Sequence, residues 1–243
     1  MNTILILGAT SEIGKEIAYE FARHGFGVVL AGRQPAKLTP LQADLQIKHQ
    51  IGVEVVEFDA LDFSSHPSFY ANLVSKPSVV ACVFGYLGSQ EKAQNDFAEA
   101  EKIIHSNYTG AVSILNIIAG DFEQKKAGTI ICISSVAGER GRQSNYFYGS
   151  AKAAFSVYAD GLRNRLFKAN VHVMTVKPGF VRTKMTEGLA LPPMLTAMPA
   201  QVGKAVFNAY LSKTNTLYVL WFWKYIMLII KNIPESIFKK LKL

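Results

Sequence analysis

Residues 3–14 read TILILGATSEIG, and they point to the architecture of the whole chain. Thr3–Leu7 is apolar without a break, which is typical of a strand buried on both faces of a parallel sheet. Gly8 permits a tight turn, and Gly14 lets the next helix pack close to the sheet. The first turn of such a helix presents free N–H groups and a positive dipole end. The pattern therefore predicts a turn that binds the phosphates of a nucleotide.

Short β-branched runs alternate with helical stretches along the rest of the chain. Further strands are expected at residues 27–31, 53–58, 79–84, 129–133 and 171–176, and helices at 12–24, 36–50, 65–75, 97–106, 109–126 and 146–169. Such alternation predicts the α/β class, with a Rossmann-type doubly wound parallel sheet in a three-layer αβα sandwich. We expect one domain over residues 1–243, in which residues 183–243 form a C-terminal substrate lid and an apolar, basic tail.

The composition fits a compact protein with anionic partners. The chain has 243 residues, of which 49% are hydrophobic and 18% charged, and its formal net charge of +8 favours a phosphorylated cofactor. No run of five basic residues marks a nucleic-acid arm, so nucleic acid is not an expected partner. Cys82 and Cys132 lie in apolar runs and are expected in the core, and no metal site is expected. The N-terminus lacks the basic region of a signal peptide, which predicts a cytoplasmic protein.

The second expected strand ends in Gly32-Arg33. A site specific for NAD would place Asp or Glu there, to accept from the ribose 2′-hydroxyl. A guanidinium instead pairs with a 2′-phosphate and stacks on adenine. The pattern favours NADPH, with NADH as the alternative, and leaves open that Arg33 is an ordinary surface residue. Asp59, after the third strand, either accepts from the adenine amino group or caps a helix.

Three residues in the second half of the chain predict ketone chemistry. Tyr148 and Lys152 are four residues apart, which places both on one face of a helix. Reduction of a ketone needs a proton donor at the oxygen, and the pKa of a free tyrosine, about 10, is high for that task. A neighbouring ammonium lowers this pKa. Ser135, after the fifth strand, can donate to the substrate carbonyl.

These motifs resemble those of the short-chain dehydrogenase/reductase superfamily over most of residues 1–185. The resemblance implies that Ser135, Tyr148 and Lys152 are catalytic, and that Asn107 holds a water that connects Lys152 with solvent. The implied cofactor-binding residues are Gly8, Thr10, Ser11, Glu12, Ile13, Gly14, Arg33, Asp59, Ala60, Gly85, Tyr148, Lys152, Pro178, Gly179, Val181 and Thr183.

The chain departs from the superfamily pattern at two places. Glu12 stands where many phosphate-binding turns have glycine, which narrows the freedom of the backbone there. The fourth strand ends Cys82-Val83-Phe84-Gly85, where the superfamily has Asn-Asn-Ala-Gly, so only the glycine is shared. The second departure removes polar contacts that the superfamily makes on the cofactor side.

A narrower resemblance is to the decaprenylphosphoryl-β-D-erythro-pentofuranosid-2-ulose 2-reductases. It rests on stretches outside the catalytic motifs, among them residues 58–62, 137–140, 181–185 and 233–241. This resemblance implies a lipid-linked ketose as substrate, in the synthesis of an arabinose donor for the cell wall, and a flavin oxidase as partner. Related folds pair through their long helices, so a homo-oligomer is expected.

The C-terminal segment leaves two interpretations open. Residues 217–230 read LYVLWFWKYIMLII, which is too short and too interrupted for a spanning helix. Residues 217–220 are expected as the last strand. The rest either packs on the core or contacts a membrane surface, which its aromatic residues and the later lysines suit. These residues are Trp221, Trp223, Tyr225, Lys231, Lys239, Lys240 and Lys242.

Two further features bear on the substrate. Arg140 and Arg142 flank the loop before Tyr148, where they either hold a substrate phosphate or are solvated charges. Prolines make the segment after residue 178 irregular, which is typical of a mobile lid; they are Pro192, Pro193 and Pro199. Two rival functions remain: reduction of another lipid-like ketone, such as a 3-oxoacyl chain or a steroid, and non-catalytic NADP binding by a regulatory protein.

Overall fold

A seven-stranded parallel sheet forms the centre of the molecule, in a computed structural model that describes residues 2–241. Its strand order is β3-β2-β1-β4-β5-β6-β9. The strands are β1 (Thr3–Leu7), β2 (Gly27–Gly32), β3 (Val53–Glu57), β4 (Val79–Cys82), β5 (Gly128–Ile133), β6 (Val171–Pro178) and β9 (Thr216–Val219). The order reverses between β1 and β4, which is where ligands bind in open α/β sheets.

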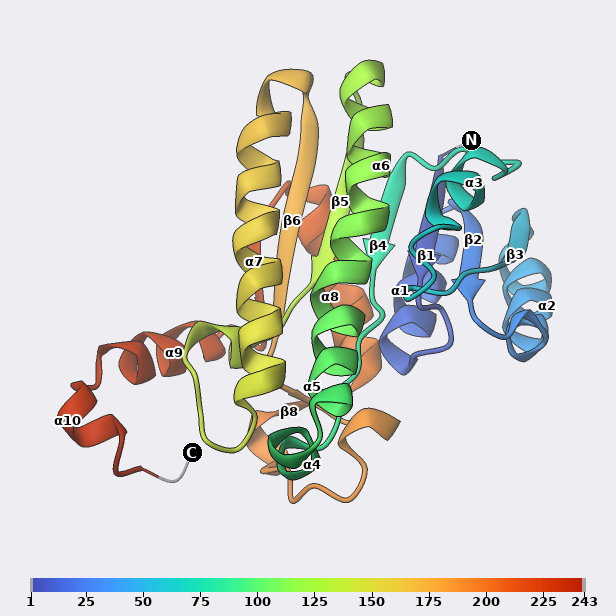
Figure 1. Cartoon of the computed structure of the whole chain (residues 1–243). Coiled ribbons are helices and arrows are strands. Elements are labelled where there is room, and N and C mark those ends of the chain that lie inside the picture. The colour runs from blue at the N-terminus through green and yellow to red at the C-terminus, as the bar shows by residue number, and fades with distance from the viewer. Residues whose placement is uncertain (1, 242–243) are drawn as a thin grey trace.

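Helices cover both faces of the sheet (Figure 1). One face is packed by α1 (Glu12–Arg23), α2 (Thr39–His49) and α8 (Pro199–Leu211). The other is packed by α3 (His66–Ala71), α6 (Gly110–Lys125) and α7 (Tyr146–Leu166). The predicted doubly wound αβα sandwich is therefore confirmed.

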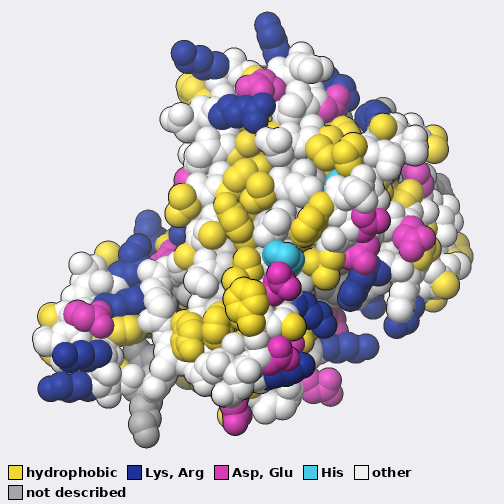
Figure 2. Space-filling model, viewed as in Figure 1, with side chains coloured by type: hydrophobic (Ala, Val, Ile, Leu, Met, Phe, Trp, Pro, Cys, Tyr) yellow, Lys and Arg dark blue, Asp and Glu magenta, His cyan; other side chains and the backbone are white. Residues whose placement is uncertain are grey.

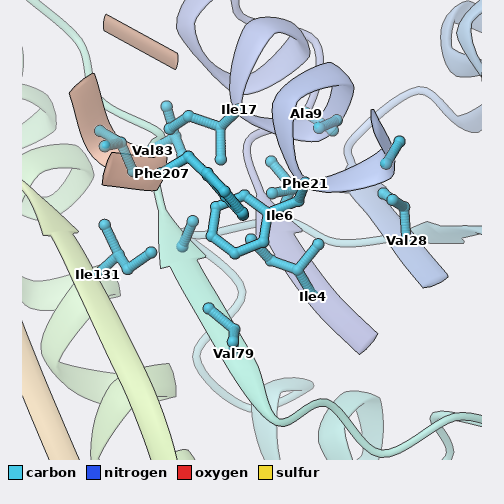
Figure 3. Packing of buried hydrophobic residues seen from close by; sticks show 14 of the residues in the cluster. Ile4, Ile6, Ala9, Ile17, Phe21, Val28, Val79, Val83, Ile131 and Phe207 are labelled. Carbon is cyan, nitrogen blue, oxygen red and sulfur yellow. The ribbon is translucent and has the colours of Figure 1, made fainter. Parts of the chain in front are cut away.

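Alternate residues of the buried strands supply the two cores. Ile4 and Ile6 of β1 face the α1 side, where they pack with Phe21 and Phe207 (Figure 3). Leu5 and Leu7 face the α6 side. Because both faces of β1 are covered, its apolar run needs no polar alternation.

Shorter elements surround the sheet, and all except the turn at Phe167–Ala169 lie at its C-terminal edge. They are α4 (Gln90–Asn95), α5 (Phe97–Ile104), a π-helical turn at His105–Thr109, 3₁₀ turns at Pro35–Leu38, Val136–Glu139, Phe167–Ala169, Lys184–Thr186 and Pro193–Leu195, and the small strands β7 (Phe180–Val181) and β8 (Thr196–Ala197). Two last helices, α9 (Trp223–Asn232) and α10 (Glu235–Phe238), project from the body beside the start of α7 (Figure 1).

Several element boundaries differ from the sequence expectations. The helix expected at 36–50 begins as a 3₁₀ turn, and α2 starts only at Thr39, because Pro40 suits the first turn of a helix and not its interior. The helix expected at 65–75 ends at Ala71. α4 was not predicted, since it is a single short polar turn of chain. The two helices expected at 97–126 are joined by the π-helical turn.

The largest difference concerns the C-terminal segment. Residues 183–243 were expected as lid and tail, yet α8 belongs to the sandwich, whereas the last strand expected at 217–220 is confirmed as β9. Val202, Val206 and Phe207 of α8 are buried in the α1-side core, and β9 extends the sheet beside β6. The lid is thus limited to residues 183–198, and the tail to residues 221–241. No helix within residues 2–241 is long and apolar enough to cross a membrane.

Candidate active site

The three predicted catalytic side chains line one cleft. Ser135 follows β5, and Tyr148 and Lys152 lie on the first turns of α7. The cleft has a volume of about 450 Å³ and opens at the C-terminal ends of the strands. A wider hollow of about 820 Å³ lies elsewhere, around the starts of β2 and β3, and none of the predicted site residues lines it. The chemistry therefore belongs to the smaller cleft.

Tyr148 is held as a neutral phenol. Burial raises its pKa to about 12, and a hydrogen bond with the Ser135 side chain opposes this rise. The Ser135 hydroxyl also accepts from the N–H of Ala137 at 3.1 Å, which fixes its position at the end of β5. At neutral pH the phenol carries its proton, so it is in the form that donates.

Lys152 lies beneath Tyr148 in the interior. Its Nζ donates to the carbonyl of Ile133 at 3.0 Å and lies 5.8 Å from the centre of the Tyr148 ring. Burial lowers the pKa of Lys152 to about 8. Burial thus outweighs any lowering of the Tyr148 pKa by this ammonium, because removal from water disfavours the charged forms of both groups; that Lys152 stabilises the Tyr148 phenolate stays a prediction.

Asn107 is buried in the π-helical turn and uses its amide on the backbone. Its Nδ2 donates to the carbonyls of Tyr86 and Ile103 at 2.6 and 2.8 Å, and its Oδ1 accepts from the N–H of Tyr86 at 3.2 Å. A Cβ at position 85 would lie 2.7 Å from this Oδ1 and 3.4 Å from Nζ of Lys152, so only glycine fits at Gly85. Asn107 thereby fixes the segment that follows β4. The water relay through Asn107 stays a prediction.

The phosphate turn has the geometry expected of it. Gly8 has a φ of +94°, and a Cβ there would lie 2.7 Å from the backbone N of Phe84, so glycine is required. Ser11 caps α1: its hydroxyl accepts from the N–H of Gly14 at 3.0 Å and donates to the carbonyl of Gly8 at 2.9 Å. Its hydroxyl was expected to face phosphate and serves the helix instead.

The helix itself keeps the capacity to bind an anion. The N–H groups of Glu12 and Ile13 lie in the first turn of α1, where the helix offers them no carbonyl acceptor. Ile13 also lines the cleft, so this helix end borders the catalytic side chains. The Glu12 carboxylate accepts from the N–H of Lys184 at 3.3 Å, which joins the helix start to the lid.

Residues at the expected adenine end lie outside the cleft. Arg33 is exposed directly after β2, and no acidic residue stands in its place. The Asp59 carboxylate accepts from the N–H of Leu61 at 3.0 Å, which forms a turn before α3 and is not the predicted cap of that helix. Together with α1, these positions form the end of the site at which the adenine half of a nicotinamide cofactor is expected.

The nicotinamide side is closed by a segment that was not assigned to the site. Pro178, Gly179, Val181 and Thr183 line the cleft as expected. Trp223 of α9 also lines the cleft. Its indole lies so close to Gly179 that a Cβ at that position would overlap the ring. The indole Nε1 donates to the carbonyl of Leu195 in the lid at 3.2 Å. In the sequence, only the aromatic residues of this segment indicated that it closes the cleft, and aromatic residues also suit a membrane contact.

The sequence profile of short chain dehydrogenases matches residues 2–192. An uncharacterized oxidoreductase of Mycobacterium tuberculosis is 33% identical over 241 residues, which cover 98% of this chain and 96% of the relative. This chain belongs to the short-chain dehydrogenase family.

Other members of the family are similar over the same core. The NADP-dependent 3-hydroxy acid dehydrogenase of Schizosaccharomyces pombe is 26% identical over 190 residues, which cover 76% of this chain and 73% of that protein. Among solved structures, a short-chain dehydrogenase from Sphingobium yanoikuyae in complex with NADPH superimposes with a TM-score of 0.82 at 23% identity, over 97% of this chain and 98% of its own. The latter likeness establishes the shared fold.

Proposed function

We propose that this short-chain dehydrogenase reduces a ketone to a secondary alcohol with NADPH. The observation that carries the proposal is the convergence of Ser135, Tyr148 and Lys152 in one cleft that the first turn of α1 borders. The reduced nicotinamide supplies the hydride when it is bound. The protein supplies the proton and the orientation of the carbonyl.

Each catalytic side chain has one task. The Tyr148 hydroxyl donates its proton to the carbonyl oxygen, and the Ser135 hydroxyl donates a hydrogen bond that orients the same oxygen. As Tyr148 loses its proton, the positive charge of Lys152 stabilises the phenolate. Asn107 keeps the neighbouring backbone in place, and a water held there would return a proton to Lys152.

For the cofactor, Arg33 favours NADPH over NADH. Its guanidinium is exposed at the end of β2, where a 2′-phosphate would lie in a dinucleotide that runs from α1 to the cleft. Thr10, in the turn before α1, and Ala60, in the loop after β3, complete the adenine side of the proposed site.

For the substrate, the narrower resemblance supports the 2-keto group of a polyprenylphosphoryl pentofuranose. An apolar wall suits a substrate with a lipid portion; it is made by Leu87, Ile103, Met185, Leu189 and Trp223. A 3-oxoacyl chain or a steroid is the alternative within the same chemistry. A flavin oxidase would supply the ketone by oxidising the corresponding alcohol.

A peripheral contact with an anionic membrane fits the outer face of the tail. Trp221, Tyr225 and Ile229 are exposed at 73%, 55% and 67%, although their neighbours Trp223 and Met227 are buried. Lys and Arg side chains gather at the tip of the projecting segment (Figure 2). Apolar rings beside basic residues are the composition of interfacial helices.

The test of the proposed function is turnover by purified protein with NADPH and a panel of ketones. Tyr148→Phe keeps the ring and removes the proton donor, so we expect kcat to fall by about 10²–10⁴-fold while NADPH still binds. Ser135→Ala should cost about 10²–10³-fold. NADPH binding without oxidation by any ketone, and with no effect of Tyr148→Phe on cellular function, would support the regulatory alternative.

A further inference from the structure

Two arginines on the loop between β5 and α7 have opposite surroundings. Nη1 of Arg140 donates to the carbonyls of Ile230 and Ile233 at 2.5 and 2.7 Å, and its Nη2 pairs with Glu235 at 3.0 Å. The guanidinium also lies over the ring of Phe238. Arg140 therefore caps the C-terminal end of α9, where a positive charge is favoured, and its charge is already paired within the protein.

Arg142 lines the catalytic cleft without such partners. Among residues 2–241 its guanidinium has one hydrogen bond, from Nη2 to Sδ of Met227 at 3.3 Å, and a thioether is a weak acceptor. Its Nε is buried and has no acceptor among the described residues. Burial lowers the pKa of Arg142, and no Asp or Glu side chain in the described part of the chain opposes this effect. Glu139, the nearest acidic residue along the chain, is engaged by Lys177 and Tyr218.

The same wall holds two more polar side chains with unused capacity. Gln90 and Asn145 both line the cleft. The Gln90 carbonyl accepts from the N–H of Phe147 at 3.3 Å, and its buried Nε2 has no acceptor in the described part of the chain. Buried Oδ1 of Asn145 likewise has no donor there. Buried polar groups are normally paired, so this wall is built for a polar ligand group.

We propose that Arg142, assisted by Gln90, binds an anionic group of the ketone substrate, a phosphate or a carboxylate. The inference rests on the proposed function, because the ketone end of the same molecule must reach Tyr148 and Ser135. An anionic oxygen entering the cleft replaces the Met227 thioether as acceptor, and the planar guanidinium can hold two such oxygens. The site thereby selects anionic ketones over neutral ones of the same size.

Matched ketone pairs test this selection. Dihydroxyacetone phosphate is compared with dihydroxyacetone, and acetoacetate with ethyl acetoacetate, by following NADPH oxidation. We expect the wild type to have the higher kcat/KM for the anionic member of at least one pair. A preference in the first pair indicates a phosphate as the bound group, and a preference in the second pair indicates a carboxylate. Arg142→Gln should reduce that preference by about 10- to 100-fold, as expected for the loss of one charge-assisted hydrogen bond. Arg142→Lys should keep part of it.

Arg140→Gln is the matched control. It should lower the melting temperature, because α9 loses its cap, but it keeps the Arg142 charge, so the anionic-to-neutral ratio of kcat/KM should fall far less than in Arg142→Gln. An equal ratio in the wild type and in Arg142→Gln overturns the proposal, and so does a wild type that prefers both neutral ketones.

A binding measurement separates this proposal from the proposed function. The melting temperature is measured with NADP⁺ and either dihydroxyacetone phosphate or acetoacetate. At least one of these two ligands should raise the melting temperature of the wild type more than that of Arg142→Gln. If no ketone is turned over but this Arg142-dependent shift persists, the anion site stands and ketone reduction falls. If neither turnover nor the shift is found, both proposals fail.

Discussion

The ammonium of Lys152 lies inside the protein, where burial lowers its pKa from 10.5 to about 8. At neutral pH Lys152 is charged both in the folded protein and in the unfolded chain. The charge costs more free energy in the folded interior than it does in water. A cost of this kind is typical of functional sites. It also makes stability depend on pH in a way that identifies the residue.

Lys152→Met should remove this dependence. The folded-state pKa of Lys152 is below its unfolded value, so the destabilisation is fully present below about pH 8 and disappears as pH rises to about 10.5. Between about pH 7 and about pH 10, the free energy of unfolding of the wild type should therefore rise by roughly 2 kcal/mol relative to that of the variant. Urea denaturation of both proteins across this range measures the difference. A constant difference would contradict the buried charge.

Arg33 gives a second test at the scale of one side chain. Arg33→Asp should weaken NADPH binding by about 10- to 100-fold, because a charge-assisted contact to the 2′-phosphate is replaced by repulsion. NADH binding should change much less. Titration with both nucleotides measures this, and Lys204→Asp, a charge reversal on the exposed side of α8, is the control. Equal losses for the two nucleotides would refute the assignment.

Some residue roles could be predicted from local pattern, and others could not. Tyr148 and Lys152 are one helical turn apart, so their shared face follows from spacing alone. Arg140 and Arg142 are two residues apart in the same loop, and local pattern cannot separate them. Their difference comes from α9, since Arg140 contacts Ile230 and Arg142 contacts Met227.

At the scale of elements, α9 is the part that completes the cleft. Trp223 is buried, packs against Gly179 and holds the lid through the carbonyl of Leu195. Phe180 contacts the same indole edge-on, with ring centres 5.5 Å apart. The predicted cofactor-binding segment, the expected lid and α9 are therefore linked by one side chain.

Trp223→Ala should break this link. The loss of a buried indole costs about 3–5 kcal/mol of unfolding free energy. We expect faster proteolysis within residues 183–198 as well, because the lid loses its attachment. Trp221→Ala is the natural control: that indole is 73% exposed, and its removal should change stability by less than about 0.5 kcal/mol. Similar losses in both variants would contradict the role of Trp223.

The strands of the sheet were easier to predict than the elements around the cleft. Apolar runs such as Thr3–Leu7 are buried on both faces, so their pattern needs no knowledge of neighbours. The helix α8 follows a proline-rich stretch, so its residues were included in the expected lid. Its adjacent buried residues Val206 and Phe207 are the sign in the sequence that it packs in the core. Tertiary packing against α1 decides its place.

At the scale of the molecule, the exposed face of the tail predicts behaviour at membranes. The wild type should float with vesicles that contain phosphatidylglycerol and not with pure phosphatidylcholine, and added salt should weaken the binding. Replacing Trp221, Tyr225 and Ile229 by serine should abolish flotation. The control replaces Val157 and Phe167, which are also exposed apolar residues but lie on or just after α7.

Two outcomes would argue against a membrane role for this face. Wild-type protein that fails to float with anionic vesicles would contradict the proposal directly. If the same triple replacement instead lowers the mass of the particle in sedimentation, the face belongs to an interface between copies of this chain, and that interface differs from the pairing through long helices that the family resemblance implies.

The link between α9 and the cleft has a consequence for how substrate range can change. The proposed hydride chemistry uses side chains within residues 8–183, whereas the segment of residues 221–241, which Arg140 fastens, contributes Trp223 to the wall of the cleft. A chimera that borrows only this closing segment from a relative would inherit a new substrate ranking while its turnover chemistry stays the same. The substrate range of such proteins would thus change by exchange of one short C-terminal segment, while the part of the fold that carries the reaction stays the same.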